Sequence, residues 1–152
     1  MSKETSNKDE INKIIYKGNL VWTGEPYESD VRWMPNENGR IETTWIPPKE
    51  LQNCFSKKNF HGKDLNFPDN NHIGVLGIDS YDISNTVDGE GSNGAIVGLS
   101  KFNMVGCPQK SFFLKYLHRP DKETDFYDDA IKICKFYGMY ALIESNKPQI
   151  LK

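Results

Sequence analysis

The sequence predicts an α/β protein built around a sheet that mixes antiparallel and parallel strands. Three observations predict this fold class: three strand-like apolar segments in succession, then an amphipathic helical segment, then a fourth apolar segment. Strands joined by short connections usually pair antiparallel, whereas a helix between two strands returns the chain in the parallel direction. We therefore expect three antiparallel strands, a helix, and a fourth strand that lies beside the first and runs parallel to it.

Composition limits the classes of protein to consider. The 152 residues include 19 Lys and Arg against 21 Asp and Glu, so any nucleic-acid or membrane partner must be met by a local patch. Cys54, Cys107 and Cys134 lie far apart without CxxC spacing, which indicates free thiols in a reducing compartment. The N-terminus is polar and no apolar run is long enough to span a membrane. We therefore expect a soluble, intracellular protein that does not enter a membrane.

The first part of the chain divides into a tail and a β-rich segment. Residues 1–13 are polar and charged, as in a tail or a linker. In residues 14–71, aromatic and β-branched residues alternate with polar ones, as in half-buried strands, although residues 49–71 are loop-rich. Asn38-Gly39 lies between two strand-like runs and predicts a hairpin, because both positions of such a turn tolerate positive φ.

Residues 72–152 carry the elements of the predicted α/β core. Ile73–Ile78 is a continuous apolar run that predicts a central strand. Ala95–Phe102 and Ser111–His118 predict the second and third strands. The fourth strand is expected in "MYALIESN", which follows the helix.

The helix between the third and fourth strands has clear end signals. Thr124 is the expected N-cap, Asp125, Asp128 and Asp129 suit the positive end of the helix dipole, and Gly138 is placed to end the helix. The apolar face expected at helical spacing contains Tyr127, Ala130, Ile131, Cys134 and Tyr137.

Two of the predicted strands end on an acid. Asp79 follows the first strand and Glu144 follows the fourth. On adjacent parallel strands these acids would emerge at the same end of the sheet, about 5 Å apart. Two unpaired carboxylates at that distance repel, so one should bind a proton or both should share a hard cation such as Mg²⁺ or Mn²⁺. The alternative is that Asp79 is a strand-end acid whose partners are the amides of the next loop.

Several motifs of the chain resemble one family. "GIDSYD", "GSNGAIVGLSKF", "RPDKETDFYDDAIKICKFYGM" and "ALIESNKP" are similar to the nuclease domain of tailed-phage large terminases, especially those of phages infecting gut Bacteroidetes. "SDVRWMPNENGRIETTWIPPKELQN" resembles the β-rich segment that precedes that nuclease. The resemblance covers roughly residues 20–152. It implies a ribonuclease H-like fold and a two-metal endonuclease that cuts concatemeric viral DNA.

The resemblance also implies roles for particular residues. Asp79 and Glu144 become the catalytic residues and the ligands of Mg²⁺ or Mn²⁺, with Asp82 and Asn146 as candidates to support them. The family's third acid lies on a helix beyond the fourth strand, whereas this sequence stops at Lys152, and the GxxxxGK[ST] motif of the packaging ATPase does not occur. The sequence therefore predicts a nuclease core that is incomplete at its C-terminus.

The partners implied are double-stranded viral DNA, the portal and the small terminase subunit, in the host cytoplasm at the viral procapsid. Lys110, Lys115, Arg119 and Lys122 could follow a DNA backbone, although scattered lysines usually serve solubility. One alternative is a non-catalytic module that binds nucleic acid or a capsid component on an inert ribonuclease H-like fold. Another is a stand-alone nuclease acting on junctions or RNA–DNA hybrids.

Overall fold

The structure is a computed structural model that describes residues 14–79, 94–101, 111–118 and 123–143. These residues form a seven-stranded sheet, a separate two-stranded sheet, the helix α2 (Glu123–Tyr137) and the short 3-10 helix η1 (Lys49–Leu51). The large sheet has the strand order β2-β1-β3-β8-β7-β6-β9. Its strands are β1 (Tyr16–Trp22), β2 (Val31–Pro35), β3 (Ile41–Thr43), β6 (Gly74–Asp79), β7 (Gly94–Ser100), β8 (Phe112–His118) and β9 (Ala141–Ile143).

The predicted α/β class with a mixed sheet is confirmed. Strands β6, β7 and β8 pair antiparallel in succession, and β9 pairs with β6 in parallel after the helix α2. All other pairs described in the large sheet are antiparallel. The sheet is larger than the four strands expected of residues 72–152, because β3 pairs with β8 and so adds β1, β2 and β3 to the same sheet.

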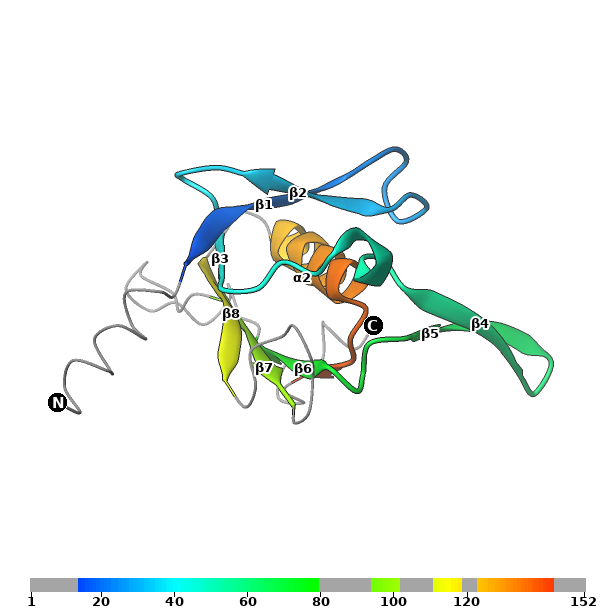
Figure 1. Cartoon of the computed structure of the whole chain (residues 1–152). Coiled ribbons are helices and arrows are strands. Elements are labelled where there is room, and N and C mark those ends of the chain that lie inside the picture. The colour runs from blue at the N-terminus through cyan, green and yellow to red at the C-terminus, as the bar shows by residue number, and fades with distance from the viewer. Residues whose placement is uncertain (1–13, 80–93, 102–110, 119–122, 144–152) are drawn as a thin grey trace, which may run out of the picture.

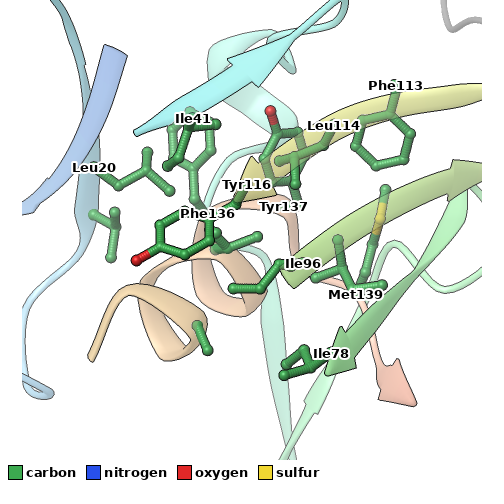
Figure 2. Packing of buried hydrophobic residues seen from close by; sticks show 14 of the residues in the cluster. Leu20, Ile41, Ile78, Ile96, Phe113, Leu114, Tyr116, Phe136, Tyr137 and Met139 are labelled. Atoms are coloured by element: carbon green, nitrogen blue, oxygen red, sulfur yellow. The ribbon is translucent and has the colours of Figure 1, made fainter. Parts of the chain in front are cut away.

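The core lies between one face of the large sheet and α2 (Figures 1 and 2). Phe126, Ile133 and Phe136 of the helix are fully buried against sheet residues such as Leu76 and Ile96. Burying each of these side chains stabilises the fold by on the order of 2 kcal/mol. The predicted apolar face of the helix was wrong in part, because Ile131 is 45% exposed while Phe126, Ile133 and Phe136 are buried.

The predicted hairpin at Asn38-Gly39 is wrong. Strands β2 and β3 do not pair with each other: both pair with β1, one on each side of it. Neither Asn38 nor Gly39 has a positive φ. A Cβ on Gly39 would lie 2.4 Å from backbone atoms of Gly18, so the connection between β2 and β3 crosses β1 in direct contact with it. The glycine serves a close approach of two backbones rather than a turn.

Residues 49–71, expected to be loop-rich, contain a regular β-ribbon instead. Strands β4 (Phe55–Phe60) and β5 (Lys63–Pro68) form the two-stranded sheet, which projects away from the rest of the molecule (Figure 1). His61 and Gly62 connect them with φ of 52° and 84°, as a type I′ turn requires. Burial periodicity could not reveal these strands, because most of their residues are exposed on both faces.

The base of this ribbon is fastened to the C-terminal end of α2. The backbone N–H of Asn53 donates a hydrogen bond to the carbonyl of Phe136. The side-chain amide of the buried Asn70 donates a hydrogen bond to the backbone carbonyl of Tyr137. Carbonyls in the last turn of a helix have no partner within the helix, so the two asparagines satisfy them. Gly138 ends the helix as predicted, with φ of 63°.

Candidate functional site at the end of strand β6

Asp79 is the last residue of β6 and lies on the face of the large sheet opposite α2, which we call the open face. Along β6, Leu76 and Ile78 are buried in the core, and the alternation of a strand places Val75, Gly77 and Asp79 on the other side. The Asp79 side chain is exposed. Its carboxylate is therefore accessible to a ligand at the point where the strand leaves the sheet.

Strand β9 brings the end of a second strand beside Asp79. The parallel register pairs Leu76 with Ala141 and Ile78 with Ile143. Both strands therefore run toward the same end of the sheet, as the sequence predicted. Glu144 follows Ile143 directly in the sequence but lies outside the described residues, as do Asp82 and Asn146. The proximity of the Asp79 and Glu144 carboxylates thus stays a prediction.

The fit to a divalent metal depends on residues beyond those described. Asp79 offers carboxylate oxygens, the donor type that Mg²⁺ and Mn²⁺ prefer. A single carboxylate does not make a metal site. Among the described residues, three or more His, Cys, Asp or Glu side chains are nowhere grouped so that they could hold a metal ion. Glu144 would have to supply the second ligand.

A second feature of the open face is a recess of about 300 Å³ between β1, β3 and β8, which we call the cationic recess. Cross-strand pairing places Lys17, Glu42 and Lys115 in one row across these three strands. Glu42 lies 3.9 Å from the Lys17 ammonium. Among the described residues, the recess is lined by Lys17, Asn38, Gly39, Arg40, Glu42, Lys115, Leu117 and His118, and in this set the basic side chains outnumber the one acid.

The cationic recess and Asp79 share one face of the sheet. Asp79 pairs with Ala95 on β7, and Ala95 pairs with Leu117 on β8, which lines the recess. Adjacent strands lie about 4.8 Å apart, so two strand spacings separate Asp79 from Leu117 by about 10 Å. Lys115, considered from the sequence as one of several scattered lysines, therefore lies in a cationic recess on the same face of the sheet as Asp79.

Arg40 is among the residues that line the recess, but its guanidinium is bonded to Asp129, a buried acid of α2. Asp129 is only 6% exposed and accepts hydrogen bonds from Arg40 Nε at 2.9 Å and Nη2 at 3.1 Å. It also accepts from the Tyr116 hydroxyl at 2.8 Å. Burial, and then the neighbouring Asp129 carboxylate, raise the pKa of Tyr116, so this hydroxyl keeps its proton and remains a donor. Most of the Arg40 charge is thus compensated internally, and Lys17 and Lys115 supply the outward-facing charge.

Sequence reasoning missed this network, although a signal was present. Asp129 was assigned to the helix dipole, but it occupies a buried position in the stripe of Phe126, Ala130 and Ile133. An acid inside an apolar stripe requires a cationic partner. Arg40 is one of only three arginines in the chain, so it was a candidate for the cationic partner of Asp129.

By its fold, the described chain is an α/β protein with a mixed seven-stranded sheet packed on one face by a helix. No protein-family model, no curated protein and no solved structure matches the sequence or its fold. The resemblance to terminase nucleases therefore stays a prediction. Within the described ranges, no helix has the length and apolar character needed to cross a bilayer.

Proposed function

We propose that this chain is the nuclease portion of a phage large terminase, which hydrolyses phosphodiester bonds of double-stranded viral DNA with Mg²⁺ or Mn²⁺. The observation that carries the proposal is the parallel pairing of β6 with β9, which aligns Asp79 with the end of the strand that precedes Glu144. The strand order β8-β7-β6-β9 is also consistent with the ribonuclease H-like sheet that the resemblance implies.

Each proposed role follows from the chemistry of a residue. Divalent ions, when bound, supply Lewis-acid activation of water and of the phosphodiester. Asp79 and Glu144 would hold these ions, and Asp82 and Asn146 would orient the two carboxylates. Lys17 and Lys115 in the cationic recess, on the same face of the sheet as Asp79, would attract further phosphates of the substrate.

The alternative function is a non-catalytic module that binds nucleic acid or a capsid component. One observation favours it: the open face carries exposed apolar side chains beside the charged ones, and Leu117 and Leu142 are 54% and 70% exposed. Apolar surface of this kind is typical of a protein contact. On the nuclease proposal, the same face would meet the portal or the small terminase subunit at the procapsid in the host cytoplasm.

Metal binding tests the proposed site directly. We expect weak Mg²⁺ binding, on the order of millimolar, and tighter Mn²⁺ binding, because two carboxylates make a small ligand set and the affinity order favours manganese. In a calorimetric titration with Mn²⁺, Asp79→Asn and Glu144→Gln should each abolish the binding. Asp30→Asn removes an exposed acid elsewhere and should leave it unchanged.

Plasmid nicking in Mn²⁺ gives the functional readout. Cleavage should be slow, because the two assigned acids offset only half of the charge on two divalent ions. Any cleavage should disappear in Asp79→Asn and persist in Asp30→Asn. If Asp79→Asn binds Mn²⁺ as well as the parent chain, the proposed site is wrong. If the parent chain, with Asp79 and Glu144 intact, binds Mn²⁺ but does not nick the plasmid, the result would instead favour the non-catalytic module.

A further inference from the structure

The β4–β5 ribbon has two chemically different faces. Its register pairs Lys58 with Leu65 and Phe60 with Lys63, and paired residues share a face. The first face, which we call the ribbon front, contains Ser56, Lys58, Phe60, Lys63, Leu65 and Phe67. The second face, which we call the ribbon back, contains Phe55, Lys57, Asn59, Asp64, Asn66 and Pro68. The Lys58 ammonium lies 5.5 Å from the centre of the Phe67 ring, as expected of two residues on one face.

The positive charge of the ribbon is concentrated on its front. Within the paired strands, the front carries Lys58 and Lys63 and no acid, whereas on the back Lys57 is accompanied by Asp64. An acid borders the front at the base of the ribbon, where Asp69 accepts a hydrogen bond from Ser56. The whole chain, by contrast, has more acids than bases, with 21 against 19. The front is therefore a local cationic surface on a slightly acidic protein.

The front also exposes apolar groups that contribute little to the fold. Phe60 is 58% exposed and Leu65 is 41% exposed, on a ribbon that projects away from the core (Figure 1). A two-stranded ribbon in water gains little from such side chains, since none of the described elements forms a third layer over them. An exposed aromatic ring with a lysine directly opposite presents both a stacking surface and a cation to one ligand.

We propose that the ribbon front binds a nucleic-acid strand with unpaired bases. Phe60 stacks on a base, and Lys58 and Lys63 contact the phosphates on either side. Alternating aromatic and cationic groups are the usual means by which proteins bind single strands, because every base has a face on which a ring can stack. Attachment of the ribbon base to α2 through Asn53 and Asn70 fixes the direction in which this surface points. The site uses neither Asp79 nor a metal.

The experiment measures binding of a fluorescently labelled single-stranded oligodeoxynucleotide to the whole chain in EDTA. Phe60→Ala should weaken binding about 5-fold or more, with the salt dependence unchanged. Replacing Lys58 and Lys63 by Ala together should make the plot of log K against log salt less steep by about 1.4, since each lost phosphate contact contributes about 0.7. All these residues are exposed and distant from the core, so the variants should unfold at the parent temperature.

Matched controls separate this site from general attraction to lysine. Lys57→Ala removes the same charge from the ribbon back and should change binding little. Because EDTA removes divalent ions, the proposed metal site does not contribute to this binding, so failure of the ribbon proposal is distinguishable from failure of the nuclease proposal. The proposal is overturned if Lys57→Ala and Lys58→Ala weaken binding equally, or if duplex binds as tightly as single strand with no effect of Phe60→Ala. Equal binding of polyglutamate through the same residues would also overturn it, in favour of an acidic protein partner.

Discussion

The Arg40–Asp129 pair shows how much one side chain contributes to both the fold and the site. Asp129 joins α2 to the β2–β3 connection through Arg40 and to β8 through Tyr116. Removing one partner of a buried pair leaves the other with an uncompensated charge. The Arg40 side chain is 36% exposed, so water would compensate part of its charge.

We expect Asp129→Ala to lower the free energy of unfolding by about 3 kcal/mol, the low end for a buried pair because Arg40 is partly solvated. Urea denaturation measures this change. Asp125→Ala, at an exposed position in the first turn of the same helix, should cost at most about 1 kcal/mol. Equal losses in the two variants would mean that Asp129 acts only through the helix dipole.

At the scale of single residues, sequence reasoning selected the acid at the end of β6 as a candidate site residue. It did not identify Asp129 as a buried acid of the helix. Asp79 was recognisable because it ends a continuous apolar run, and the structure places it at the exposed end of β6; its role in binding stays a prediction. Asp129 was not recognised because its partner lies 89 residues away, and helical periodicity contains no information about distant pairs.

At the scale of elements, sequence rules predicted the pairing of strands correctly where only one rule applied to the segment. A helix joins β8 to β9, and a helical crossover returns the chain in the parallel direction. The parallel pairing of β9 with β6 follows from this rule. Asn38-Gly39 misled because glycine is compatible with two different demands, a positive φ and a close backbone approach. The structure uses the second, at the crossing over Gly18.

Gly39→Ala tests this explanation. A Cβ at 2.4 Å from Gly18 must displace one of two backbones, so we expect a loss of about 1–3 kcal/mol in the free energy of unfolding. Gly24→Ala is the matched control, because its Cβ would first meet Ser29 at 3.4 Å. Urea denaturation of both variants measures the difference. A Gly39→Ala chain as stable as Gly24→Ala would show that the crossing tolerates a side chain.

At the scale of the whole molecule, the β-rich segment and the α/β core share one sheet and one core. Ile41 pairs with Tyr116 across the β3–β8 boundary, and Leu20, Val31 and Trp45 belong to the same buried cluster as α2. A boundary between residues 71 and 72, as the sequence suggested, would pass through this shared core.

We therefore expect residues 14–143 to unfold in a single transition. The chain offers two independent probes, because its tryptophans, Trp22, Trp33 and Trp45, lie in the β-rich segment while α2 lies beyond it. Tryptophan fluorescence and helical circular dichroism should give the same midpoint in urea, as two-state behaviour requires. Midpoints that differ would indicate two units that unfold separately.

The three-residue strand β3 also sets the order in which this protein can assemble during synthesis. Thr43 and Phe113, which contact each other across β3 and β8, are 70 residues apart. A ribosome adding about 5–20 residues per second needs roughly 4–14 s to make the partner of an already finished β3. Closing a loop of that length costs on the order of 4 kcal/mol of chain entropy, which favours a late joining of the two halves. For those seconds β3 is an open edge, and its short length leaves few backbone groups for a neighbouring nascent chain to pair with.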